Sequence, residues 1–175
     1  MRKAKRFTPA LIRRLQNEGR GQGIRQDFNA FHQVKRGDPP SRGTSSIIPP
    51  MGQFSAGHLL SVAEGVSHEF STMVPRTDDR RHQVPLSRDS HSNCIVEYSN
   101  WDDERIYPGT LEICENLGIR HPRLRLHEDI EQWILTTDIV LTLLSPAKRR
   151  RLLAISVKDV PFSQLTKRNR DLLRV

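Results

Sequence analysis

Two apolar runs, each holding one charged residue, constrain the fold more than any other feature of the sequence. Residues 133–144 contain Asp138, and residues 152–158 end in Lys158. Both runs have the length and composition of β-strands, and a short basic loop separates them. Strands joined by so short a connection pair as an antiparallel hairpin. The sequence therefore predicts an acid and a lysine near one another, at the ends of two neighbouring strands.

The composition indicates a polyanionic partner. The chain has 175 residues and a formal net charge of +8, which fits one domain with a peripheral arm and favours nucleic acid as the partner. The longest apolar run is too short to span a bilayer, so we expect no membrane association. Cys94 and Cys114 lie in separate segments without metal-ligand spacing. We expect a reduced, cytoplasmic compartment, with the protein associated with a bacterial nucleoid.

The rest of the chain predicts helices around a sheet. Thr8 and Pro9 begin a helix that Gly19 ends, and residues 24–50 read as a long surface arm with short strands at most around Ile47. Further helices are expected at residues 108–117, before Gly118, and 162–174, with short strands at 82–86 and 95–98. In residues 59–72 a helical stripe is expected to face the core, formed by Leu59, Ala63, Val66 and Phe70.

Asp138 and Lys158 have the spacing of a metal-dependent nuclease site. Cleavage of a phosphodiester needs charge stabilisation, an activated water and a proton for the leaving oxygen, and Mg²⁺ held by a few oxygen ligands supplies the first two. Thr137-Asp138 followed by Ser156-Val157-Lys158 matches the order of the PD-(D/E)xK nucleases, with a serine in place of one acid. Helical Glu64 is the candidate third carboxylate. We also expect the backbone carbonyl of Val157 to be a metal ligand.

Each of these residues has an ordinary explanation when taken alone. Asp138 could be a strand residue facing water, Lys158 a solvated strand end and Glu64 a helix-surface acid. The basic runs are most often solvated faces, but beside a nuclease site they would contact DNA phosphates. The candidate DNA-binding residues are Lys148, Arg149, Arg150, Lys167, Arg168 and Arg170.

Six segments together resemble TnsA, the endonuclease subunit of the heteromeric transposases of Tn-seven-type transposons. They begin with Glu18-Gly-Arg-Gly-Gln-Gly23, run in the family's order and cover most of the chain; the others are residues 58–64, 79–86, 118–122, 136–138 and 154–158. The resemblance implies that Glu64, Asp138 and Lys158 form the catalytic triad. Residues 87–117 are longer than the family's segment, and the family's usual C-terminal ATPase-binding domain is expected to be absent.

The resemblance also implies a fold and a function. The expected fold is an α/β restriction-endonuclease-like core, a mixed central sheet flanked by helices, in residues 58–175, with residues 1–57 as a basic N-terminal helix and extended arm. The expected activity is magnesium-dependent cleavage at the 5′ ends of a transposon, with manganese as a substitute metal. A TnsB-type transposase is the expected partner, and a TnsC-type ATPase is a further candidate.

Two other functions fit the same residues. One is a structural DNA-binding subunit of the transposition complex that does not cut. The other is a stand-alone repair or restriction nuclease, which would cut naked DNA without a partner.

Overall fold

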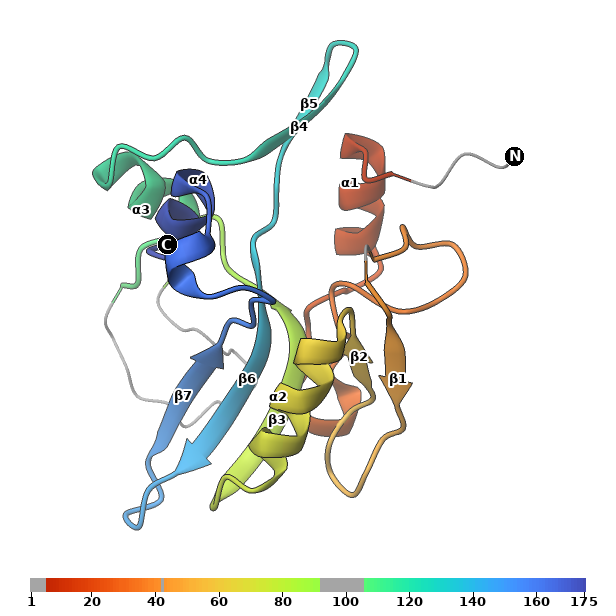
Figure 1. Ribbon diagram of the computed structural model, residues 1–175, viewed down its shortest axis with the longest axis vertical. Helices are drawn as coiled ribbons and strands as arrows, with labels where there is room; N and C mark the ends of the chain where they lie inside the picture. Colours follow the sequence, from red (N-terminus) through yellow and green to blue (C-terminus); the bar gives the residue numbers. More distant parts are fainter. Residues whose placement is uncertain (1–5, 42, 92–105) are drawn as a thin grey trace.

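A three-stranded antiparallel sheet forms the centre of the fold (Figure 1). The computed structural model describes residues 6–41, 43–91 and 106–175. The sheet has the order β3-β6-β7, where β3 is Thr77–Pro85, β6 is Thr136–Leu144 and β7 is Arg150–Ile155. β6 and β7 form the predicted hairpin, with Ile139 opposite Ile155 and Leu144 opposite Arg150.

The strand boundaries differ from the sequence prediction. β6 begins at Thr136 rather than at residue 133, and β7 ends at Ile155, so Lys158 follows the strand instead of ending it. Both pairings in this sheet are antiparallel, whereas a mixed sheet was predicted. The restriction-endonuclease-like assignment stays a prediction.

β3 is a polar strand that is nevertheless buried. Residues 78–83 lie in the interior although all six are polar or charged. The Arg81 guanidinium lies 3.2 Å from the Asp79 carboxylate. Asp78 accepts ion pairs from Arg25 at 2.9 Å and from Arg150 at 3.3 Å. Internal pairing makes this burial possible, because a buried charge without a partner is costly. The predicted strand at residues 82–86 is the end of this longer strand.

The helix α2 (Val62–Thr72) packs with its polar side inward. Ser61 caps its first turn by accepting a hydrogen bond from the Glu64 N–H at 3.2 Å. Glu64, His68 and Ser71 are the buried positions, whereas Val66 is 53% and Phe70 63% exposed. The predicted buried stripe is therefore wrong for Val66 and Phe70, whereas Leu59 is buried but lies before the helix begins. The buried side chains of β3 are polar and need hydrogen-bonding partners. α2 therefore turns its polar residues toward β3 and leaves its apolar residues exposed.

The N-terminal helix α1 (Pro9–Asn17) follows its predicted caps. The Thr8 hydroxyl accepts a hydrogen bond from the Leu11 N–H at 3.2 Å, and Gly19 has the left-handed backbone (φ 69°) that ends a helix. α1 contributes to the apolar core, whose buried members are Ile12, Leu15, Phe31 and Ile134. The division of the chain at residue 57 stays a prediction.

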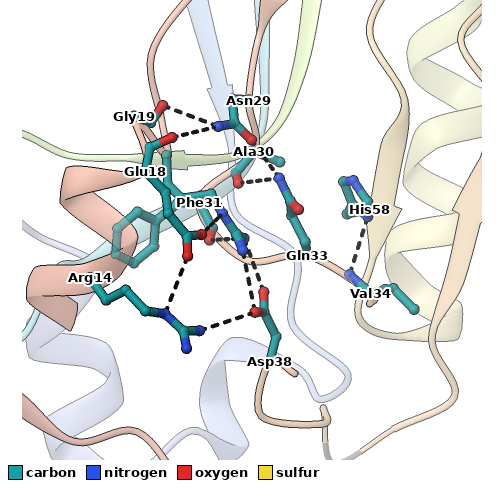
Figure 2. Close-up of polar contacts among 11 residues, drawn as sticks. Arg14, Glu18, Gly19, Asn29, Ala30, Phe31, Gln33, Val34, Asp38 and His58 are labelled. Atoms are coloured by element: carbon teal, nitrogen blue, oxygen red, sulfur yellow. Dashed lines mark hydrogen bonds and ion pairs between the residues drawn. The ribbon is translucent and has the colours of Figure 1, made fainter. Parts of the chain in front are cut away.

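A buried ion pair fixes the turn that follows α1. The Arg20 guanidinium donates to the Asp38 carboxylate at 3.0 and 3.2 Å and to the Phe31 carbonyl at 3.2 Å. Figure 2 draws Phe31 and Asp38 at this turn, and to their right the Val34 N–H, which donates to His58 Nδ1 at 3.1 Å. These bonds hold the extended segment against β2 (Gly57–Leu59), which pairs with β1 (Ser46–Ile48).

The remaining elements extend from the sheet. β4 (Arg123–Leu126) and β5 (Asp129–Gln132) form a separate hairpin that packs beside α1. The helix α3 (Thr110–Asn116) ends before Gly118 (φ 64°), as predicted. α4 is Lys167–Leu172, and short 3-10 turns lie at Arg25–Asp27 and Phe162–Gln164. The strand predicted at residues 95–98 lies outside the described residues.

None of the helices in the described part of the chain is both long enough and apolar enough to cross a bilayer.

Candidate functional site

Asp138 and Lys158 meet where β6 begins and β7 has ended. Ile139 and Ile155 form the last strand pair, so Asp138 lies one residue before it and Ser156 one residue after it. The Val157 N–H donates to Asp138 Oδ2 at 2.6 Å, and Lys158 Nζ lies 3.8 Å from the same oxygen. The predicted proximity of the acid and the lysine is therefore confirmed.

Glu64 reaches the same end of the sheet from the first turn of α2. Its Oε2 accepts hydrogen bonds from the Leu60 N–H at 3.0 Å and from Gln83 Nε2 at 2.9 Å. Glu64 is 6% exposed. Burial raises the pKa of the Glu64 carboxyl, and the negative charge of Asp138 raises it further, although its hydrogen bonds lower it. Two carboxylates from distant parts of the chain thus repel one another at one site.

Gln83 belongs to this site although the sequence did not single it out. Its neighbours His82 and Val84 pair with Ile139 and Thr137 on β6. Gln83 on β3 therefore lies opposite Asp138. Gln83 is 1% exposed, and its backbone is left-handed (φ 54°), which is uncommon for a residue with a side chain. Its side-chain amide donates to Glu64. The sequence placed Gln83 in a predicted short strand at residues 82–86, but it gave no sign that this polar side chain is buried.

A pair of histidines makes a second contact between α2 and β3. His68 is one turn beyond Glu64, His82 precedes Gln83, and His68 Nδ1 lies 3.0 Å from His82 Nε2. Burial lowers the pKa of His82 to about 3, with the positive charges of His68 and Arg80 adding to the effect. Both rings are therefore neutral at pH 7. This contact holds the first half of α2 against the strand that carries Gln83.

The two carboxylates fit the needs of a divalent cation. Asp138 Oδ1 has no hydrogen bond among the described residues, and Glu64 Oε1 has only the Ser61 hydroxyl at 3.4 Å. Mg²⁺ is commonly held by one or two carboxylates together with waters and substrate phosphates. In the described ranges no three His, Cys, Asp or Glu side chains cluster closely enough to bind a metal by themselves. Any further ligands would be backbone, water or substrate oxygens.

Lys158 is held in place by its own loop. Its Nζ donates to the Ser156 hydroxyl at 2.7 Å and to the Val157 carbonyl at 2.9 Å. The Val157 carbonyl therefore already accepts one hydrogen bond, and its second lone pair is what a metal could use. The Lys158 side chain is 37% exposed, so its ammonium can reach a bound substrate. Ser156, which replaces the motif's second acid, acts here as an acceptor for the lysine.

The predicted DNA-binding residues fall into two separate groups. Lys148, Arg149 and Arg150 lie at the far end of the β6–β7 hairpin, about 20 Å from Asp138 at the rise of a β-strand. Arg150 is paired with Asp78 within the protein. The other group, on α4, lies close to the candidate site, because α4 residues Asn169 and Leu172 line a pocket together with Lys158. Lys167, Arg168 and Arg170 belong to this helix.

The comparisons with known proteins give partial matches only. Phospho-N-acetylmuramoyl-pentapeptide-transferase of Corynebacterium kroppenstedtii is 45% identical over 56 residues, which is 32% of this chain and 15% of that protein. The proteins of the same name from Kocuria rhizophila and Nocardia farcinica are 42% identical over 55 residues and 41% identical over 57 residues. Those matches cover 31% and 33% of this chain, and 15% and 16% of the relatives. No protein-family profile matches the chain.

These matches overturn the resemblance to TnsA. The curated relatives carry the name of a transferase and not that of a transposition endonuclease. The chain spans less than a fifth of their length, so they assign no family either. The glycines of the first matching segment have a local structural cause. In the glycine-rich segment, a side chain at Gly21 would collide with the ring of Pro85, and one at Gly23 with the backbone of Asp27.

Proposed function

We propose that this chain is a metal-dependent endonuclease that hydrolyses phosphodiester bonds of double-stranded DNA. The observation that carries the proposal is the convergence of Glu64, Asp138 and Lys158 at one end of the sheet. Two carboxylates close enough to repel, with a lysine ammonium 3.8 Å from one of them, suit a divalent cation and a phosphate oxygen together.

Each residue has a distinct proposed role. Glu64 and Asp138 hold Mg²⁺, which when bound supplies charge stabilisation at the phosphate and a more acidic water. Gln83 keeps the Glu64 carboxylate turned toward Asp138 by donating to Oε2. The Lys158 ammonium donates a hydrogen bond to a phosphate oxygen and so stabilises the charge that develops on it.

The substrate class follows from what these groups recognise. Carboxylates, a metal and a lysine engage the phosphate backbone, which every DNA duplex offers. The net charge of +8 favours a polyanion of this kind. We therefore propose duplex DNA as the substrate, and the 5′ ends of a transposon and a transposase partner are not part of the proposal.

Cleavage of supercoiled plasmid DNA in Mg²⁺ or Mn²⁺ tests the proposal. We expect the wild-type chain to nick or linearise the plasmid, and Glu64→Gln, Asp138→Asn and Lys158→Met to cut at least about 100-fold more slowly while still binding DNA. Matched controls are Glu69→Gln, an exposed acid on the same helix, and Lys35→Met, an exposed lysine.

Two results would contradict the proposal. If the three site variants cut as well as wild type, the catalytic assignment is wrong. If the wild-type chain binds duplex DNA in a mobility-shift assay but cuts it under none of these conditions, the chain is a non-cleaving DNA-binding subunit.

A further inference from the structure

A basic pocket opens between residues 118–123 and α4. The cationic side chains in its lining are Arg120, Arg123, Lys167 and Arg168, with Asp171 as the acidic one. In Figure 1, residues 118–123 form the connection that leads from α3 into β4. Arg120 and Arg123 are far in sequence from the two α4 residues, so the pocket gathers positive charge that neither segment carries alone.

The four cations of the pocket are not paired with any acid of the protein that the structure describes. Within the part of the chain that the structure describes, none of the four makes an ion pair or a side-chain hydrogen bond. Many other arginines are paired with an acid; examples are Arg13, Arg20, Arg25, Arg81, Arg88 and Arg150. All four pocket cations are exposed. Their repulsion is therefore left for an external anion to relieve.

The framework around the pocket is fixed by hydrogen bonds. His121 Nε2 lies 3.2 Å from the Thr110 hydroxyl, and its Nδ1 lies 3.0 Å from the Pro122 carbonyl. The Trp133 N–H donates to the same Pro122 carbonyl at 2.9 Å. The Thr166 hydroxyl caps α4 by accepting from the Asn169 N–H at 3.2 Å. The cations are thus displayed on two segments whose backbones are held in place.

α4 separates this pocket from the candidate catalytic site. Lys167, Arg168 and Asp171 line the basic pocket, whereas Asn169 and Leu172 line the pocket that contains Lys158. An α-helix is only about 10 Å across, so the two pockets lie within the reach of one DNA strand. A strand whose phosphate lies at Lys158 therefore has further phosphates beside the basic pocket.

We propose that Arg120, Arg123, Lys167 and Arg168 bind backbone phosphates of a DNA strand within a few nucleotides of the bond that is cut. The position of the cut bond rests on the proposed endonuclease function, but the binding itself does not depend on cleavage. Phosphate contacts of this kind fix where the strand lies and carry no sequence information.

The test is the salt dependence of binding to a fluorescent 30-base-pair duplex, measured in EDTA so that no cleavage occurs. Arg120→Ala/Arg123→Ala should bind about tenfold more weakly at low salt. The slope of log K against log[salt] should fall in magnitude by about 1.8, because each lost phosphate contact removes about 0.9. The control is Arg36→Ala/Arg125→Ala, which changes the net charge equally at exposed arginines outside the pocket. Thermal unfolding of both variants checks that they fold.

The outcomes separate the pocket from the catalytic proposal. If the pocket variant keeps the wild-type slope, or loses no more than the control, the pocket does not bind phosphate, whether or not the wild-type chain cuts. If the wild-type chain never cuts DNA but the pocket variant alone loses slope, the phosphate site stands and the endonuclease function fails.

Discussion

Glu64 is the residue whose surroundings conflict most with its charge. It is buried, and the carboxylate of Asp138 lies close enough to raise its pKa further. Both hydrogen bonds from Leu60 and Gln83 go to Oε2, so a glutamine with its oxygen at that position keeps them. Glu64→Gln therefore removes a charge without removing its partners. The conflict is the expected signature of a site that trades stability for function.

We predict that Glu64→Gln stabilises the protein at pH 7 but not at pH 4. Because the folded pKa of Glu64 is raised, the folded state binds more protons than the unfolded state as the pH rises from about 4.3 through that pKa. The free energy of unfolding of the wild type therefore falls over this pH window and stays lower above it. The fall is about 1.4 kcal/mol for each pKa unit by which the folded Glu64 exceeds the unfolded one. Thermal unfolding of wild type and variant at both pH values measures this.

The control for this prediction is Glu69→Gln, which neutralises an exposed acid on the same helix. We expect its midpoint to follow that of the wild type at both pH values. A Glu64→Gln variant that gains nothing between pH 4 and pH 7 would show that Glu64 carries no burial penalty.

Gln83 is predicted to act as a positioning residue. Gln83→Leu removes the donor to Glu64 and with it a hydrogen bond that lowers the pKa of Glu64. We expect cleavage to fall about tenfold and its acid limb to move to higher pH, because Glu64 must lose its proton to bind metal. A pH–rate profile beside that of Gln53→Leu, a glutamine that donates to the Asp78 carbonyl instead, tests this. A lower rate with an unmoved limb would mean that Gln83 is merely structural.

At this scale the sequence identified the residues that stand out from their neighbours. Asp138 and Lys158 each lie in an apolar run, so their charges indicated a functional site. Gln83 could not, because it sits among polar residues and its burial depends on α2 and on the first forty residues packing over β3. The Phe31 N–H, for example, donates to the Gln83 carbonyl at 3.1 Å. Burial by segments that are distant in the sequence cannot be recognised from the residues around Gln83.

Among the elements, α2 departs furthest from its sequence pattern. Its apolar residues Val62, Val66 and Phe70 are 67%, 53% and 63% exposed, and Met73, the residue after its end, is 68% exposed. Periodicity predicts which residues share a face, but it cannot tell which face turns inward when the neighbouring strand is polar. β3 was likewise shortened in the prediction, because buried charges become possible only with partners such as Arg25 and Arg150.

The outward face of α2 yields a stability prediction. Val66→Lys/Phe70→Lys should change the free energy of unfolding by no more than about 0.5 kcal/mol for each substitution, because exposed side chains have few contacts to lose. Leu59→Ala, at a position that is 2% exposed, should cost about 2–5 kcal/mol by comparison. Urea unfolding measures both. A loss of several kcal/mol in the lysine variant would mean that this face is packed.

The His68–His82 contact predicts acid sensitivity at the junction of α2 and β3. The folded pKa of His82 is lowered to about 3. Between about pH 6.5 and pH 3, His82 therefore binds a proton in the unfolded state but stays neutral in the folded state. Stability contributed here is present above pH 6.5 and is lost as the pH falls toward 3. His82→Gln should flatten the fall in unfolding midpoint between pH 7 and pH 5. His127→Gln, an exposed histidine, is the control and should leave that fall as steep as in wild type.

The whole molecule divides its charges into paired and unpaired sets. Acids and arginines pair inside and around β3 and in the turn after α1, whereas the cations beside α4 have no partner in the described ranges. The net charge of +8 is visible in the sequence, but this division is not, since it depends on which segments meet. For the same reason short matching segments suggested a family that the comparisons do not support.

Metal binding by Glu64 and Asp138 should stabilise the whole fold. If Glu64 and Asp138 hold a divalent cation, adding Mg²⁺ should raise the unfolding midpoint, because a ligand that binds only the folded state stabilises it by RT ln(1 + [L]/Kd), about 1.4 kcal/mol at ten times Kd. EDTA should reverse the shift.

The shift should also be larger at pH 7 than at pH 4, since a protonated Glu64 neither binds metal nor repels Asp138. Thermal unfolding of wild type, Glu64→Gln/Asp138→Asn and Glu69→Gln, each with MgCl₂ or with NaCl of equal ionic strength, separates site binding from screening. A shift that persists in the double variant, or that NaCl reproduces, would place any bound metal elsewhere. A shift confined to chains with both carboxylates would locate it at the sheet end where Lys158 lies, independently of whether DNA is cut.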